Sequence, residues 1–489
     1  MPFSFLTSLR VALVGSVLVA AGPVAEAQPP RFDPDALTPA MASQRAVDTS
    51  PELAALRAEA ESAHLGSDGA VIGLVPRLTL SAGYRRLSPI TNPPFGGPPL
   101  DATDPGVAGE LAAVNDPASA ALFDRLTRGN ADQAAFPVFL NDYELRARLD
   151  YSLTAAVLRE LPRRRAAQLQ ATVADLTVED GARQVALAAQ RVYFAAASAR
   201  AADEVARETL RRAQADLALV QARLEGGDAT PAEGLSAESA VAIAEAEVAR
   251  TETEVAVTTA QLAQVLHVDD AAPLQLALPP TPSGSALPTA DALLPNALAQ
   301  RPELQGLRAS EAAQQETRSA ARAGQLPDLS VYGDIVSANP NQRIFPPSQR
   351  FDTTWEIGVT LAWSPNDLLT SGTAVDQADA ALAATQATLR QAEEAVALAL
   401  RVARARLLAT DREIARRQAA LSAAEASQRL RVAELEAGAT TAAEVLRASV
   451  AVDAARIALR RAEIDARSLA AELDFAAATQ TWSPAEASR

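Results

Sequence analysis

The sequence predicts an α+β membrane protein made of two structural repeats. Each chain is expected to give four strands to a trimeric 12-stranded transmembrane β-barrel and to continue into a long α-helical coiled-coil tunnel. Three observations predict this fold. The sequence is duplicated, each copy carries two strands with alternating apolar and polar residues, and long stretches free of helix breakers follow the strands.

Short motifs that recur at fixed displacements reveal the duplication. The motif at 51–53 returns at 302–304, 251 residues later, whereas the motif at 185–188 returns at 396–399, 211 residues later. The smaller second displacement indicates that the copies differ in length between their paired strands. The enlarged segment of the first copy, 85–142, connects two strands at one rim of the barrel, and its middle, 107–126, is expected to form a short helix over the mouth.

The domain organisation follows from the repeats and from the character of the first residues. The first residues have the pattern of an export signal, with Arg10, an apolar run over 11–21 and a small-residue cleavage site at 25–27. We expect a signal peptide over 1–27, a first repeat over 28–267, an inter-repeat linker or equatorial segment over 268–300, a second repeat over 301–475 and a C-terminal tail over 476–489.

Alternation with a period of two predicts four strands, over 76–84, 143–153, 328–336 and 355–364. Strands of about nine to eleven residues have the length of a tilted membrane strand. A half-buried soluble sheet would also alternate. Two sets of side chains on opposite faces favour the membrane barrel: an aromatic girdle of Tyr143, Tyr151, Trp355 and Trp363, and a charged lumen of Glu144, Arg146, Arg148, Asp150 and Glu356.

Four strands cannot close a barrel on their own. An open sheet edge in lipid would leave backbone donors and acceptors unpaired, at several kcal/mol each. Two copies would give eight strands with an interior nearly filled by side chains, whereas three copies give twelve strands around an aqueous passage. The sequence therefore predicts a homotrimer in contact with outer-membrane lipid.

Four long helices are predicted, over 154–224 and 232–266 in the first copy and over 370–436 and 442–475 in the second. A helix of 65 to 70 residues is about 100 Å long. Helix 232–266 is expected to stack end to end with a helix over 302–325, and helix 442–475 with a helix over 51–72. An Ala-rich coiled coil without a barrel is the alternative interpretation of these segments.

Composition excludes several classes of protein. The formal net charge is −16 and the 44 basic residues are all Arg without a basic patch, which argues against a nucleic-acid partner. Cys is absent, and His64 and His267 are isolated from any nucleophile or ligand motif. We therefore expect no enzyme activity, no cofactor and no metal site.

Two similar turns separate the paired helices. The first contains Gly227, Thr230, Glu233 and Leu235, and the second contains Gly438, Thr441, Glu444 and Leu446. Glycine permits the positive φ of a helix end, and Thr followed three residues later by Glu has the spacing of a capping box. With the strands and the duplication, these turns make the chain similar to the TolC family of outer-membrane efflux proteins, the outer membrane factors, over essentially its whole mature length.

The resemblance implies a gate at the second turn. Acidic residues there line the periplasmic constriction of the family, and the match carries over to Glu444. One turn later this chain has Arg447 where the family's best-known members have a second acid. Arg447 is expected to pair with Glu444 at i,i+3 and to soften the negative potential of a three-fold ring.

The resemblance also implies a function. It is that of the outer-membrane channel of a tripartite efflux or type I secretion system, a passive trimeric duct in the outer membrane of a Gram-negative bacterium with its helices in the periplasm. A periplasmic adaptor, or membrane fusion protein, contacts the helical tips, and an inner-membrane pump supplies the energy. Drug efflux, protein secretion and metal export all stay open. A periplasmic adaptor or coiled-coil structural protein is the alternative function.

Overall fold

The computed structural model describes residues 37–89, 116–119, 121, 139–227, 229–268, 275–281, 287–345 and 348–479. The expected signal peptide lies outside the described residues, as does most of the helix expected over 107–126. The elements in chain order are α1 (Pro39–Thr49), α2 (Pro51–Gly69), η2 (Ala70–Leu74), β1 (Arg77–Arg86), β2 (Asn141–Ser152), α5 (Leu153–Ala155), η3 (Ala156–Glu160), α6 (Leu161–Glu225), α7 (Pro231–Leu266), α8 (Ala290–Gln300), α9 (Pro302–Ala323), β3 (Asp328–Asn339), β4 (Asp352–Ala362), α10 (Asp367–Glu436) and α11 (Ala442–Ala477).

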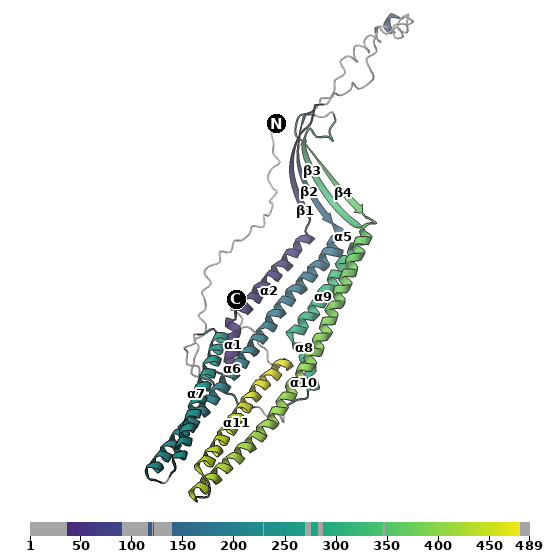
Figure 1. Cartoon of the computed structure of the whole chain (residues 1–489). Coiled ribbons are helices and arrows are strands. Elements are labelled where there is room, and N and C mark those ends of the chain that lie inside the picture. Colours follow the sequence, from purple (N-terminus) through teal and green to yellow (C-terminus); the bar gives the residue numbers. More distant parts are fainter. Residues whose placement is uncertain are drawn as a thin grey trace.

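The four strands form one antiparallel sheet in the order β1-β2-β3-β4, so β1 and β4 are its edges. The register pairs Leu80 with Ala147 across β1 and β2, Ala147 with Ile335 across β2 and β3, and Ile335 with Trp355 across β3 and β4. In Figure 1 the strands lie at one end of the molecule and helices continue from them. The predicted alternation therefore places one row of apolar residues across the whole sheet.

The apolar face of this sheet is the exposed one. In β4 the odd-numbered residues from Trp355 to Leu361 are between 67% and 73% exposed, whereas Glu356 and Gly358 beside them are only partly exposed. A soluble sheet with one solvated face buries its apolar side and exposes its polar side. β2 follows the same pattern, whereas every residue of the edge strand β1 is exposed. An exposed apolar face and a partly buried polar face fit an apolar solvent outside the sheet and a polar interior.

A long helix adjoins each strand: α2 leads into β1, β2 into α6, α9 into β3 and β4 into α10. The helices α6 and α10 have 65 and 70 residues, which corresponds to rods of about 100 Å. Among the described residues, no helix combines the length and the apolar character that a bilayer span requires. Helix α6 packs against α2, α7, α9 and α11, and α10 packs against α9 and α11.

Small residues allow these helices to approach closely. Most of the buried residues of α6 are alanines. At Gly181 an added Cβ would lie 2.7 Å from Leu56 Cδ1 and 3.2 Å from Leu53 Cδ2, so glycine lets these leucines of α2 pack directly on the α6 backbone. In the second repeat, Leu400 and Leu407, seven residues apart on α10, are almost completely buried in a cluster shared by α8, α9, α10 and α11.

The middle of the molecule is held by Tyr193, which is fully buried in α6. Its hydroxyl oxygen lies 2.8 Å from the carbonyl oxygens of both Leu37 and Ala277, where two segments distant in sequence form a short parallel bridge. Burial raises the pKa of Tyr193 to about 12, so the hydroxyl keeps its proton at neutral pH. This contact fastens the start of the first repeat and the segment between the repeats to one long helix.

The structure corrects several predicted boundaries. Leu153 begins α5 instead of ending a strand, because the Ser152 hydroxyl accepts a hydrogen bond from Ala155 N and caps the helix. The helix predicted to begin at 154 contains the π-helical turn η3 before α6. β4 ends at Ala362, so Trp363 lies beyond the sheet. Helix α8 lies in part of the expected linker, where Thr289 caps it, and α11 continues to Ala477.

The predicted end-to-end stacking of the shorter helices was wrong. Arg45 Nε of α1 donates to Leu266 O at the end of α7, at 3.2 Å, and Asn296 Nδ2 of α8 donates to Ala477 O at the end of α11, at 2.9 Å. The last carbonyls of a helix need donors, and these side chains supply them. Helix α7 therefore continues towards α1 and α2, and α11 towards α8 and α9 (Figure 1).

The substitution Tyr193→Phe tests the central fastening. It keeps the ring and removes the hydroxyl, and we expect it to lower the free energy of unfolding by about 1–3 kcal/mol. The loss should shrink as the pH rises from about 10 towards 12, because a raised pKa in the folded state makes the hydroxyl's contribution complete below the unfolded pKa and absent above the folded one.

Thermal unfolding in detergent, followed by circular dichroism, measures this difference. Tyr84→Phe is the matched control, because the Tyr84 hydroxyl donates only to Asn141 Oδ1 at an exposed position. We expect the control to stay within about 0.5 kcal/mol of the wild type. Equal effects of the two substitutions would contradict the role given to Tyr193.

Candidate functional site

The candidate functional site lies at the end of the molecule opposite the sheet, where the hairpins α6–α7 and α10–α11 turn (Figure 1). Gly227 and Gly438 have φ values of +84° and +71°, as the sequence predicts for helix ends. The chain then reverses and reaches Thr230 and Thr441, which precede the return helices in extended conformation. The two turns are called the tip turns below.

The first tip turn contains the predicted capping box. Thr230 Oγ1 accepts a hydrogen bond from Glu233 N at 3.3 Å, and Thr230 N donates to Glu233 Oε2 at 2.7 Å. The backbone bond from Thr230 keeps the pKa of Glu233 below its ordinary value. Leu235, also predicted at this turn, is exposed on the next turn of α7. The Glu233 side chain therefore caps the N-terminus of α7.

The second tip turn is built differently, and the predicted capping box was wrong there. The Thr441 side chain makes no capping bond, and Glu444 instead pairs with Arg447, whose Nη1 lies 2.7 Å from Glu444 Oε1. The predicted i,i+3 ion pair is thus confirmed. Because the Glu444 carboxylate pairs with Arg447 instead of accepting from Thr441 N, it stays on the helix surface as a group that can face a passage.

An open groove joins the two tip turns. It has a volume of about 460 Å³ and brings together Thr230, Glu233, Thr441 and Leu446, four residues that the sequence analysis placed at the tips. Its apolar wall comes from Leu219, Val220, Leu435 and Val445. A second opening of about 880 Å³ continues along α6 between α7 and α11, past Arg447 and up to Asp453. The two hairpins therefore meet across a partly empty seam near the tip.

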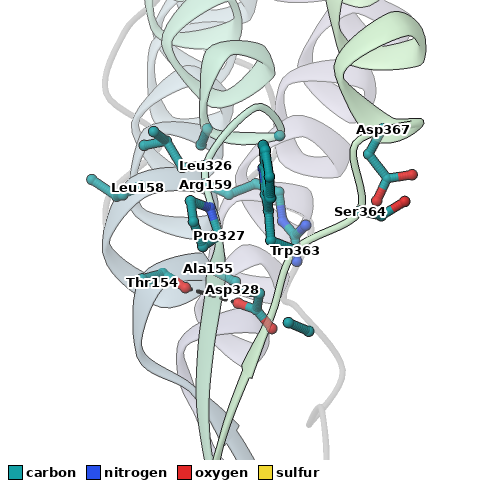
Figure 2. Close-up of a pocket in the computed structure, with 13 residues that line it drawn as sticks. Thr154, Ala155, Leu158, Arg159, Leu326, Pro327, Asp328, Trp363, Ser364 and Asp367 are labelled. Carbon is teal, nitrogen blue, oxygen red and sulfur yellow. Dashed lines mark hydrogen bonds between the residues drawn. The ribbon is translucent and has the colours of Figure 1, made fainter.

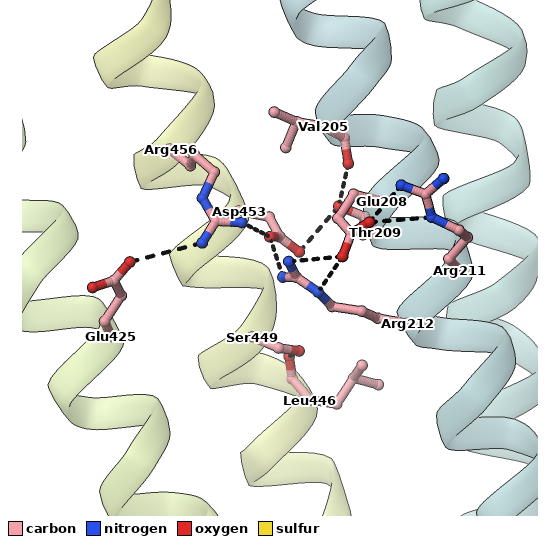
Figure 3. Close-up of polar contacts among 10 residues, drawn as sticks. All are labelled: Val205, Glu208, Thr209, Arg211, Arg212, Glu425, Leu446, Ser449, Asp453 and Arg456. Carbon is pink, nitrogen blue, oxygen red and sulfur yellow. Dashed lines mark hydrogen bonds and ion pairs between the residues drawn. The ribbon is translucent and has the colours of Figure 1, made fainter.

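A polar network closes the upper end of this seam (Figure 3). Asp453 of α11 is 5% exposed, and its Oδ1 lies 2.8 Å from Arg212 Nη1 of α6. Thr209 Oγ1 donates to the other oxygen of Asp453 at 3.0 Å. Arg456 lies 3.8 Å from Asp453 and 3.7 Å from Glu425 of α10, so α6, α11 and α10 are linked through one buried carboxylate. The network is called the hairpin link below.

Sequence reasoning missed the hairpin link. Asp453 is the only charged residue between Arg447 and Arg456, in the run ASVAVDAA, and a lone carboxylate among apolar helix positions is a signal that it is buried and paired. Its partner could not be identified from spacing, because Arg212 lies 241 residues away and on the other hairpin.

The predicted lumen residues lie on one face of the sheet and neutralise one another. Glu144 pairs with Arg146 at 2.9 Å, Arg148 pairs with Asp150 at 2.9 Å, and Glu356 pairs with Arg343. The sequence analysis also missed Asp334, a 4% exposed carboxylate on β3 that lies 3.7 Å from Arg146 and 3.9 Å from Arg148. This face therefore carries charges of both signs.

The aromatic residues predicted as a girdle lie on the other side. Trp355 and Trp363 are 70% and 56% exposed, and Tyr143 packs against Tyr84 with 5.0 Å between ring centroids. Tyr151 is partly buried where β2 meets α5. Within the described ranges, no group of His, Cys, Asp and Glu has the arrangement of a metal site, and His64 forms a pair with Asp175 at 3.0 Å on the surface.

Comparison with known proteins gives the same architecture. Residues 293–479 match the family model described as outer membrane efflux protein. The Campylobacter jejuni CmeC outer membrane channel is 13% identical, with a TM-score of 0.69 over 91% of this chain and 86% of that one. The Vibrio cholerae outer membrane protein VceC is 16% identical, with a TM-score of 0.67 over 89% and 95%. A membrane protein from Pseudomonas aeruginosa is 19% identical, with a TM-score of 0.68 over 89% of each chain. No curated protein sequence matches the chain.

A double-mutant cycle on Arg212→Ala and Asp453→Ala tests the hairpin link. We expect a coupling energy of about 1–3 kcal/mol in thermal or denaturant unfolding, because Asp453 is buried and Arg212 is its closest cation, at 2.8 Å. The surface pair Arg417 and Glu413 on α10, at 3.1 Å, is the matched control. It should couple by about 0.5 kcal/mol or less. A coupling for Arg212 and Asp453 no larger than the control would show that the link carries little energy.

Proposed function

We propose that this chain, whose residues 293–479 belong to the outer membrane efflux protein family, is the outer-membrane channel of a tripartite efflux or type I secretion system. It lies in the outer membrane of a Gram-negative bacterium and its helices extend through the periplasm. The observation that carries this proposal is the sheet that exposes its apolar face and half-buries its charged face. Such a sheet suits strands with lipid outside and water inside.

Three copies close the barrel. The edges β1 and β4 of one chain are both unpaired, and pairing β4 of one copy with β1 of the next would satisfy both edges. The duplication supplies the register. Corresponding residues of β2 and β4 lie 212 apart, as Tyr143 and Trp355 do, and those of β1 and β3 lie 251 apart. Shifting the β2–β3 pair Asp150 and Tyr332 by 212 residues forward and 251 back gives Ala362 of one copy opposite Ser81 of the next. Twelve strands then surround a passage lined by the charged face.

The channel is passive. The sequence contains no phosphate-binding Gly-Lys-Ser or Gly-Lys-Thr loop, so the free energy for transport comes from a partner. An inner-membrane pump fills that role, and a periplasmic adaptor contacts the tip turns. Because cargo is chosen by the pump, drugs, secreted proteins and metal ions all fit a duct of this kind.

Opening requires the hairpin α10–α11 to move away from α6. The hairpin link resists that movement, since it joins α11 to α6 through Arg212 and Asp453. Shifting Arg212 and Asp453 by the 211-residue displacement of the helices gives Ala423 and Ala242 at the corresponding seam between copies, so this ion pair has no counterpart there. The restraint on the second hairpin is therefore concentrated within each chain, and an adaptor that opens the tip must break the link inside the chain.

The gate itself is assigned to the second tip turn. Three copies of Glu444 would form an acidic ring, and Arg447 at 2.7 Å reduces its negative potential. Ion selectivity at the ring is therefore set by both residues.

Conductance in planar lipid bilayers tests the proposed function. Purified protein is expected to run as a trimer and to insert with a small, closed-state conductance. The double variant Arg212→Ala and Asp453→Ala should raise the conductance several-fold, because the hairpins can separate without an adaptor. The exposed-pair variant Arg417→Ala and Glu413→Ala should behave as the wild type. Monomers without channel activity would refute the function, and an unchanged conductance of the link variant would refute the opening mechanism alone.

Ion selectivity tests the gate. We expect Glu444→Gln to lower the cation preference and the block by divalent cations, and Arg447→Gln to raise both, because the two substitutions change the ring's charge in opposite directions. Reversal potentials in a salt gradient measure the preference. If Glu444→Gln leaves both properties unchanged, the acidic ring does not control passage.

A further inference from the structure

A separate cavity lies where the sheet meets the helices, far from the tip. It has a volume of about 300 Å³, within the range of small-ligand sites, and is lined by α5 and η3, the end of α9, the start of β3, the end of β4 and the start of α10. Figure 2 shows the Trp363 ring crossing the cavity, with Thr154, Arg159, Pro327 and Asp328 around it and Asp367 on the α10 side.

The cavity adjoins the exposed apolar face of the sheet. Pro327 and Trp363 continue the odd-numbered rows of β3 and β4 whose apolar side chains face outward. Leu158 and Leu326 of the cavity wall are also exposed, and Leu369 just beyond it on α10 is 76% exposed. Under the proposed function, this level is the periplasmic boundary of the lipid layer, where Trp is favoured because its ring is apolar and its N–H polar.

The charged groups of the cavity are of both signs. Arg159 is 44% exposed and shares Glu160 with Arg163, at 3.1 and 3.0 Å. Arg164 and Arg165 follow in the sequence, so the start of the first rod is rich in guanidinium groups. Asp328 accepts hydrogen bonds from the hydroxyls of Ser152 and Thr154, which leaves the exposed carboxylate of Asp367 as the second charge available to a ligand.

We propose that this cavity binds the head group of a zwitterionic phospholipid with a primary ammonium, a phosphatidylethanolamine of the periplasmic leaflet. Arg159 donates to the phosphate, Asp367 accepts from the ammonium, and Trp363 and Leu326 contact the glycerol and the start of the acyl chains. The inference rests on the proposed function, because it requires the apolar face of the sheet to lie in lipid.

The pairing of charges argues for this head group over others. A purely anionic lipid has no ammonium and would leave the Asp367 carboxylate without a cation. A choline head group carries no N–H for the Asp367 carboxylate to accept. A lipid held between η3 and α10 would also bridge the first and second repeats at the point where the chain leaves the membrane.

Native mass spectrometry of the detergent-purified protein tests the site. Phosphatidylethanolamine, phosphatidylglycerol and phosphatidylcholine are added in turn at equal concentration. We expect phosphatidylethanolamine to bind most tightly, Arg159→Ala to weaken the binding of all three about tenfold, and Asp367→Asn to weaken phosphatidylethanolamine alone. Arg390→Ala, at an exposed arginine far along α10, is the matched control and should leave lipid binding unchanged.

Further measurements separate the possible failures. Inorganic phosphate at millimolar concentration should not displace the lipid, and displacement would make this a phosphate site instead. Circular dichroism and bilayer conductance of each variant show whether it folds and inserts. If Arg159→Ala folds and inserts but binds lipid like Arg390→Ala, the lipid site is refuted while the channel stands. If the wild type fails to insert, the channel itself is refuted.

Discussion

The need to pair the backbone groups at the two open edges of the sheet governs the whole structure. β1 and β4 end the sheet on either side, and the apolar side chains between them are exposed in the single chain. In lipid, unpaired backbone groups at an edge cost several kcal/mol each, and a closed ring of strands removes them. Under the proposed function, further copies would close the sheet, and the helices that adjoin each strand would form a closed wall as well.

The strands continue into the helices, so a ring of strands would extend as a ring of helices towards the tip. The polypeptide passes from β2 into α5 without a loop, because Ser152 caps the helix in the residue that ends the strand. Below the sheet, Tyr193 and the C-terminal caps supplied by Arg45 and Asn296 fix the shorter helices against the long ones. The tip is the part least tied to the rest, with an open seam of about 880 Å³ and one buried carboxylate, Asp453, at its upper end. Close packing from the sheet to Tyr193 and a partly empty seam near the tip are the features expected of the proposed duct, which opens at its periplasmic tip.

Local patterns were sufficient to predict the strands, the rods and the tip turns. Alternation sets the faces of β2 and β4, and the positive φ of Gly227 and Gly438 is a property of the residue itself. Contacts between distant segments could not be predicted. The caps from α1 and α8 and the partner of Asp453 all depend on which helices lie together. The duplication does predict one distant contact, because the pairing of β2 with β3 within a chain gives the register expected between β4 of one copy and β1 of the next.

Cysteine cross-linking between copies tests the closure most directly, since the natural chain has no cysteine. The double variant Ser81→Cys and Ala362→Cys places one thiol on each sheet edge at the register derived from Asp150 and Tyr332. Mild oxidation in membranes should give covalent dimers and trimers on a denaturing gel, and Ser81→Cys with Glu356→Cys, six residues out of register, should give almost none. Monomers alone from the first variant, or equal cross-linking of both, would contradict a barrel closed by β1 and β4 of neighbouring copies.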